Sequence, residues 1–164
     1  MKEKHAADNF IVRRTEKRDL NEVVELHQAM HEHLQGFDTE YYQLARNAHN
    51  IMYDFYYAVI GDAGKLVLVA EKENKIQGFL YAFIERRPPT MAFEKIGYIE
   101  TLFVRPPYRR QGAGRQLFKY TMNWFRSHGI QSAECTTDTR NKNTIHFLME
   151  LNFEPIQYKF KIRL

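Results

Sequence analysis

The chain contains one cysteine, Cys135, among 164 residues, and no long apolar run. A single cysteine excludes an internal disulfide and suits a reducing compartment. No apolar stretch approaches the ~20 residues that a membrane-spanning helix needs. The first ten residues are mostly polar and lack the apolar core of a signal peptide. We therefore expect a cytoplasmic protein with no membrane partner.

Acidic residues are missing from one part of the chain and gathered in another. No Asp or Glu occurs from Arg105 to Ala133, a stretch that contains six bases: Arg105, Arg109, Arg110, Arg115, Lys119 and Arg126. From Asp19 to Asp62, eight acids accompany one strong base, Arg46. The basic part suits a polyanion and the acidic part a cationic ligand, although both patterns also fit solvated helix faces. The net charge of +4 is too small to decide.

The basic stretch also raises the possibility of a nucleic-acid-binding protein. It has the necessary charge, but it contains no recognition-helix pattern and no aromatic pattern of an RNA-binding sheet. We therefore expect no nucleic-acid partner.

The periodicity of apolar residues predicts one domain over residues 1–164, with no linker or repeat. Period-two patterns predict strands over 10–15, 66–70, 76–84, 96–104, 131–137 and 156–163. Helical spacing predicts helices over 19–35, about 39–60, 112–127 and 141–151. Strands and helices of this kind place the chain in the α/β (α+β) class.

The most informative segment follows the strand over 96–104, where Pro106 and Pro107 end the strand and two glycines open a helix. The first N–H groups of a helix are unpaired and carry partial positive charge, so they bind anions. Glycine lets a phosphate approach the backbone closely, and neighbouring arginines add full charge. The segment lacks the features of dinucleotide and P-loop fingerprints. Its predicted phosphate-binding residues are Arg109, Arg110, Gln111, Gly112, Ala113, Gly114 and Arg115.

These residues resemble the acetyl-CoA motif of the GNAT (Gcn5-related N-acetyltransferase) superfamily, Arg/Gln-x-x-Gly-x-Gly/Ala. A second block, from Asn141 to Phe153, resembles that family's Asn-x-x-Ala-Ile-x-Leu-Tyr-x-x-Leu-Gly-Phe. The resemblance implies the GNAT fold. In it, a central, mixed and mostly antiparallel sheet splays between the fourth and fifth strands and is flanked by about four helices.

The resemblance also implies acetyl-CoA as cosubstrate and an amine as acceptor. The pantetheine arm would pair with main-chain groups of Leu102, Phe103 and Val104, and Asn141 would contact the same arm. A homodimer is possible, since similar proteins often dimerise. No metal is expected, because the helical spacing of His27 and His31 comes without a third ligand block.

Glu100 is the predicted catalytic residue, because it is a carboxylate in an otherwise apolar strand. Strand alternation places it on the face of Leu102, and we expect it to be partly buried. Several amine acetyltransferases that the chain resembles use such a Glu as a base acting through water. Alternatively, Glu100 binds the substrate ammonium without moving protons.

The chain departs from the family at Leu148, where the family has a tyrosine that protonates the departing thiolate. A thiol pKa of about 8.5 makes unaided departure tolerable, and Tyr158 or water could replace the acid. Asn152 stands where the family has glycine. Two functions follow: an acetyl-CoA-dependent N-acetyltransferase acting on a small-molecule or protein amine, or a catalytically weak acyl-CoA-binding module.

Overall fold

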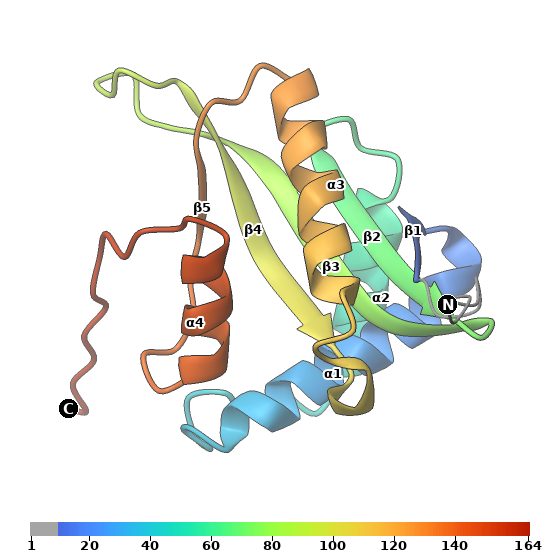
Figure 1. The fold of residues 1–164 in the computed structure, drawn as a ribbon. Helices are drawn as coiled ribbons and strands as arrows, with labels where there is room; N and C mark the ends of the chain where they lie inside the picture. The colour runs from blue at the N-terminus through green and yellow to red at the C-terminus, as the bar shows by residue number, and fades with distance from the viewer. Residues whose placement is uncertain (1–9) are drawn as a thin grey trace, which may run out of the picture.

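Five strands form one sheet in the order β1-β2-β3-β4-β5 (Figure 1). The structure is a computed structural model and describes residues 10–164. The strands are β1 (Ile11–Arg14), β2 (Lys65–Lys72), β3 (Lys75–Arg86), β4 (Lys95–Val104) and β5 (Ala133–Cys135). The first four pair antiparallel, whereas β4 and β5 are parallel. This confirms the mixed, mostly antiparallel sheet.

Helices cover both faces of this sheet. On one face lie α1 (Leu20–Gln35) and α2 (Ala48–Val59), and on the other lies α3 (Ala113–Ser127), with α4 (Lys142–Glu150) beside it (Figure 1). Two 3-10 turns, η2 (Lys17–Asp19) and η3 (Pro106–Tyr108), precede α1 and α3. The predicted helices 19–35, 112–127 and 141–151 are thus confirmed within a residue or two at their ends.

Alternation in the central strands builds one apolar core on each face. In β2, Val67 and Val69 pack toward α1 and α2, while Leu66 and Leu68 pack toward α3. The β2–β3 hairpin turns through Glu73 (φ 55°) and Asn74 (φ 59°). Two successive left-handed residues match the twist of antiparallel strands. The hairpin predicted from 66–70 and 76–84 is confirmed, and it fixes the central register.

The packing of β4 against α3 depends on Gly97. A Cβ added there would lie 2.5 Å from a ring carbon of Phe125. No other residue lets that ring lie flat against the strand, so Gly97 sets the distance between β4 and α3.

Three sequence predictions about element bounds are wrong. The second helix begins at Ala48, not Thr39, because the Asp38 carboxylate accepts from the Tyr41 N–H at 3.0 Å and holds local turns instead. The strand predicted over 131–137 is limited to Ala133–Cys135. Residues 156–163 form no strand, although they alternate, because no neighbouring strand pairs with them in the described chain.

Candidate active site

The site begins where β4 separates from β5. Parallel pairing joins only Gly97 to Ala133, Tyr98 to Glu134 and Ile99 to Cys135. Beyond Ile99, no strand of residues 10–164 lies on that side of β4. The predicted splay between the fourth and fifth strands is therefore present, and it leaves main-chain groups of β4 open.

The register of β4 against β3 determines which groups are open. The Arg105 N–H donates to the Gln77 carbonyl at 2.8 Å, and Phe103 stands opposite Phe79. Since hydrogen-bonding direction alternates along a strand, the main chain of Phe103 faces β3. The N–H and C=O groups of Leu102 and Val104 turn outward into the gap. Of the three predicted main-chain contacts, only these two face it.

A β-bulge lies at Glu100. Thr101 pairs with Tyr81 and Ile99 with the next residue, Ala82, so Glu100 is an extra residue in β4. A bulge interrupts alternation, and it places Glu100 beside Thr101 on the side of Phe103. The prediction that Glu100 shares a face with Leu102 is wrong for this reason. The expected partial burial is also wrong, because Glu100 is exposed.

Glu100 stands above a buried hydrogen-bonded chain. The Tyr56 hydroxyl lies 2.9 Å from Nδ1 of His27 and within hydrogen-bonding reach of Thr101. Burial lowers the pKa of His27 to about 4, so the ring that is hydrogen-bonded to this hydroxyl is neutral. Burial, and then the charge of Glu100, raise the pKa of Tyr81 to about 12. Both tyrosines therefore stay neutral beside this carboxylate.

Aromatic rings continue across the same face of the sheet. Tyr81 contacts Phe55 of α2 at 5.3 Å between ring centroids and Phe83 at 5.7 Å, and Phe83 contacts Tyr98 at 5.3 Å. Phe55 is 42% exposed. The rings form an apolar wall next to Glu100.

The loop between α1 and α2 (residues 36–47) contacts the segment that joins β5 to α4. The Tyr42 hydroxyl donates to Asp138 at 2.9 Å, and the Tyr42 carbonyl accepts from Gln35 at 3.2 Å. Arg140 pairs with Asp138 and donates to the Phe37 carbonyl. Polar contacts therefore fasten the loop to the segment between β5 and α4.

The glycine segment forms a cradle at the start of α3. Arg110 (φ 60°) and Gly112 (φ 94°) both adopt left-handed backbone, so the chain turns sharply into the helix. Gly112 is the N-cap and supplies no side chain, which leaves the first helical N–H groups without a side-chain cap. The cradle lies directly after the open end of β4. Strand, gap and cradle are thus contiguous, as the sequence predicts.

The three arginines around the cradle differ in their partners. Arg109 folds back, with Nε donating to the Val104 carbonyl at 2.8 Å and its guanidinium 5.3 Å from the Phe103 ring centre. Arg115 pairs with Glu150 of α4. Within residues 10–164, the Arg110 guanidinium forms no ion pair or side-chain hydrogen bond. Arg110 is therefore the arginine with its charge available.

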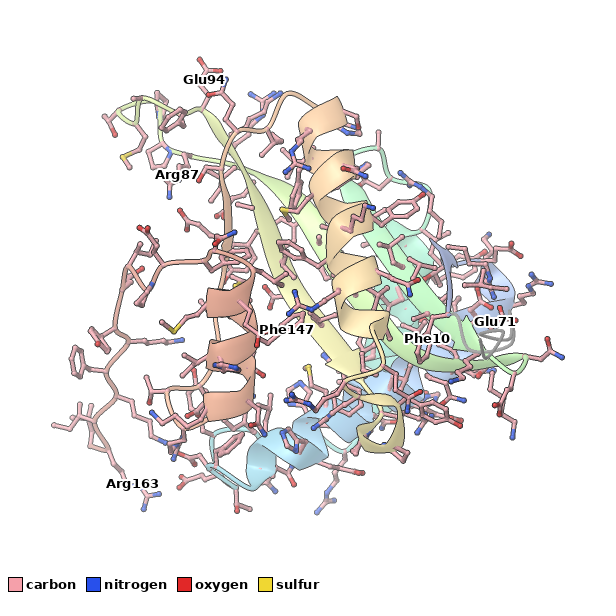
Figure 2. All side chains as sticks on the ribbon, viewed as in Figure 1. Phe10, Glu71, Arg87, Glu94, Phe147 and Arg163 are labelled. Carbon is pink, nitrogen blue, oxygen red and sulfur yellow. The ribbon has the colours of Figure 1, made fainter. Side chains whose placement is uncertain are left out.

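The second sequence block forms α4 and its cap. Asn141 is buried, and its side chain accepts from the Thr144 N–H at 3.2 Å. Leu148 is half-buried, and Asn152 adopts φ 63°, the left-handed backbone for which the family uses glycine. Figure 2 shows Phe147 directed toward α3, where it lies close to Gly114. The block thus positions α4 against the cradle.

The remaining candidates are structural. His27 is hydrogen-bonded to the Tyr56 hydroxyl. Within residues 10–164, no three His, Cys, Asp or Glu side chains lie close enough together to hold a metal ion. Burial raises the pKa of the Cys135 thiol to about 11, so it is a poor nucleophile. Tyr56, Thr101 and Tyr81 were not predicted as neighbours of Glu100, because no local signal in the sequence marks a bulge. No helix in the described chain has the length and apolarity to cross a membrane.

Comparison with known proteins points to one family. The family model described as "Acetyltransferase (GNAT) family" matches residues 20–153. No curated protein sequence matches the chain. The tetramutant of the BH1408 protein from Bacillus halodurans is 25% identical with a TM-score of 0.82, and the match covers 94% of this chain and 99% of that one.

Two aminoglycoside-acetylating enzymes are similar in fold. The 6'-N-acetyltransferase from Acinetobacter baumannii is 15% identical with a TM-score of 0.75, over 95% of this chain and 98% of that one. An aminoglycoside N-acetyltransferase in complex with CoA is 17% identical with a TM-score of 0.76, over 95% of each chain.

Proposed function

We propose that this chain, which belongs to the GNAT family of acetyltransferases, transfers an acetyl group from acetyl-CoA to a primary amine. The observation that carries the proposal is the contiguity of three features: the splayed end of β4, the exposed carboxylate of Glu100 and the left-handed cradle before α3. One extended thioester substrate can contact all three.

The cradle is proposed to hold the pyrophosphate of CoA. N–H groups without a side-chain cap at the start of α3 and the unpaired charge of Arg110 favour an anion there. Arg109 and Arg115 contribute differently, by holding the end of β4 and the side of α4 in place. Gln111, Ala113 and Gly114 supply backbone around the phosphates. Asn141 caps α4 next to the path of the pantetheine arm.

The open main chain of β4 is proposed to bind the arm and polarise the thioester. Leu102 and Val104 present outward groups, and the Val104 carbonyl is already an acceptor for Arg109. The outward N–H groups are therefore the donors for the thioester oxygen. A preorganised donor of this kind contributes ~3 kcal/mol to transition-state stabilisation.

Glu100 is proposed to act as the base through a water molecule. The amine nitrogen attacks the thioester carbonyl carbon, the C–N bond forms, the C–S bond breaks and CoA leaves as thiolate, while the second amine proton passes through water to that thiolate. Glu100 takes the ammonium proton beforehand, and its exposed position beside the apolar wall lets both water and an amine reach it. If Glu100 instead only holds the ammonium, its replacement will weaken acceptor binding without changing the pH profile.

A second function, a catalytically weak acyl-CoA-binding module, is favoured by one observation. Leu148 stands where the family has its acid, and a half-buried leucine donates no proton. Binding without turnover distinguishes this function from the first. The acceptor panel should include aminoglycosides, since enzymes of similar fold act on them, together with polyamines and peptide amines.

The test combines ligand stabilisation with release of free CoA. Acetyl-CoA should raise Tm, because a ligand that binds only the native state stabilises it. Gly112→Val should remove this rise, since valine disfavours φ 94° and intrudes on the cradle. Gly61→Val is the matched control, because Gly61 has φ 90° and nothing within 4 Å of an added Cβ. Equal acetyl-CoA affinity in the two variants would refute the cradle assignment.

A further inference from the structure

Helix α2 carries exposed apolar side chains beside the aromatic wall. Ile51 is 55% exposed and Phe55 is 42% exposed, although neither belongs to the buried side of this helix. Residues four apart lie on the same face of a helix, so these two side chains form one apolar strip. Phe55 stands edge-on to Tyr81, at an interplanar angle of 87°, and this contact joins the strip to the rings of the sheet. Exposed apolar surface that is continuous in this way marks a binding site.

The rings of the sheet continue the strip at small angles to one another. The planes of Tyr81 and Phe83 are inclined by 33°, and those of Phe83 and Tyr98 by 34°. Tyr81 and Phe83 lie on the side of the sheet that α1 and α2 cover (Figure 1), and Tyr98 stands opposite Phe83. Aromatic rings attract one another in offset or edge-on geometry at centroid distances of about 4.5–7 Å. A ring carried by a ligand therefore finds partners of its own kind on this face.

The negative charge next to these rings comes from Glu100. Burial, and then the charge of Glu100, raise the pKa of the Tyr81 hydroxyl, which therefore stays neutral. The next carboxylate on the same face of β3 is Glu85, which pairs with Ile96, whereas Tyr81 pairs with Thr101. A strand rises roughly 3.3 Å per residue, so Glu85 lies roughly 13 Å further along. An ammonium held at Glu100 thus has rings beside it before it meets a second carboxylate.

The acidic residues at the β5 side of this face already have cationic partners. Glu134 of β5 pairs with Arg87, and Asp138 pairs with Arg140 at 2.7 Å. Arg140 also lies 3.9 Å from Asp38. An acceptor with several ammonium groups would have to displace these arginines before it could use the carboxylates, so extra positive charge on the acceptor brings little binding energy here.

We propose, building on the acetyl transfer proposed above, that the acceptor is a monoamine whose body is an aromatic ring on a short alkyl chain. Its ammonium group lies at Glu100, and its ring lies against Phe55 and the rings of the sheet. This class differs from that of the aminoglycoside-acetylating enzymes of similar fold. Aminoglycosides and polyamines spread several charges over a polyhydroxylated or flexible body, which matches neither the single carboxylate nor the rings.

Phe55 is the specificity-determining residue in this assignment. It is the most exposed of the four rings, whereas Tyr81 is buried. It comes from α2 and not from the sheet, so its replacement leaves the pairing of β3 with β4 and the bulge at Glu100 intact. A change at Phe55 should therefore alter the choice of acceptor without altering the acetyl-CoA site.

Substrate comparison in variants of Phe55 tests the assignment. Release of free CoA is followed with 2-phenylethylamine and with ethylamine, which lacks the ring. Phe55→Ser should raise the KM for 2-phenylethylamine roughly fivefold and leave the KM for ethylamine unchanged, because only the first amine contacts the ring. Phe55→Trp should retain the wild-type KM values, since it restores an aromatic face. In wild type, kcat/KM for 2-phenylethylamine should exceed that for spermidine or kanamycin roughly tenfold or more.

Tyr57→Ser is the matched control on the same helix. Tyr57 is 49% exposed, and its hydroxyl lies 2.9 Å from Nζ of Lys17, in the turn before α1. This variant should leave the KM of both amines at the wild-type value. Stabilisation by acetyl-CoA shows that each variant is folded and that its cosubstrate site is intact.

Binding measurements separate the acceptor class from the transfer reaction. Calorimetric titration of 2-phenylethylamine into the protein saturated with CoA reports acceptor binding without turnover. Tighter binding than that of spermidine and kanamycin, lost in Phe55→Ser, would support the acceptor class, and would do so even if no amine were acetylated and the transfer reaction thereby failed. The assignment is overturned if 2-phenylethylamine does not bind, if spermidine or kanamycin is preferred, or if Phe55→Ser affects 2-phenylethylamine and ethylamine equally.

Discussion

Acidification should destabilise the protein through His27. In the folded chain this ring contacts Phe79 and His31, and its Nδ1 lies 2.9 Å from the Tyr56 hydroxyl. Burial, with a further contribution from His31, lowers the pKa of His27 to about 4. An unfolded histidine titrates near 6.5. The unfolded state therefore binds the proton first, so the stability is intact above about pH 6.5 and is lost as the pH falls toward 4.

The magnitude follows from the difference between the two pKa values. Each unit corresponds to about 1.4 kcal/mol, so acidification from pH 7 to pH 4.5 should remove about 2 kcal/mol, after allowance for partial exposure of the ring.

Urea unfolding followed by Trp124 fluorescence measures this loss, because Trp124 is buried and is the single tryptophan. His27→Gln keeps hydrogen-bonding capacity and cannot titrate, so its free energy of unfolding should depend much less on pH over this range. His49→Gln is the matched control, because His49 is exposed on α2 and should leave the wild-type slope unchanged. If wild type and His27→Gln lose equal free energy between pH 7 and 4.5, the argument is wrong.

Three further predictions concern catalysis and packing. Glu100→Gln should retain acetyl-CoA binding and lose kcat/KM most near neutral pH, with the deficit shrinking as free amine appears at higher pH; an unchanged pH–rate profile would leave Glu100 as a binding residue. Gly97→Ala should destabilise the fold by about 2 kcal/mol, because the new Cβ meets the Phe125 ring, and Phe125→Leu should restore part of the loss in urea unfolding. Leu148→Tyr should raise kcat modestly if thiolate departure is rate-limiting. A wild-type falling limb near pH 10 that disappears in Tyr158→Phe would instead show that another acid already acts.

Local signals predicted much of the fold and most of the cradle. The strand at 96–104, the hairpin partners and the glycine segment depend on periodicity and backbone chemistry within short windows. Left-handed backbone at Gly112 and Asn152 follows from residue type. These elements were predictable because their determinants are close in sequence.

The remaining features depend on distant neighbours. The bulge at Glu100 depends on the pairing of β4 with β3, whose register shifts between Tyr81 and Ala82. No residue type within β4 predicts it. Alternation over 156–163 predicts a strand, but a strand also needs a paired neighbour, and no strand of residues 10–164 pairs with this segment. Arg109 and Arg115 have partners at the end of β4 and in α4. The sequence shows only that the arginines are charged, so it could not predict which of them is free to bind a phosphate.

The loop fastened by Tyr42 and Arg140 has a dynamic consequence. Its contacts are polar, from the Tyr42 hydroxyl to Asp138 and from the exposed Arg140 to the Phe37 carbonyl, whereas α1 and α2 on either side are anchored in an apolar core. Regions held this way open locally at a much lower free energy than global unfolding. Their opening also becomes easier as ionic strength rises, because salt screens exposed charges. Amide hydrogens of residues 36–47 should therefore exchange earlier than those of α1 and α2, and the difference should grow with ionic strength.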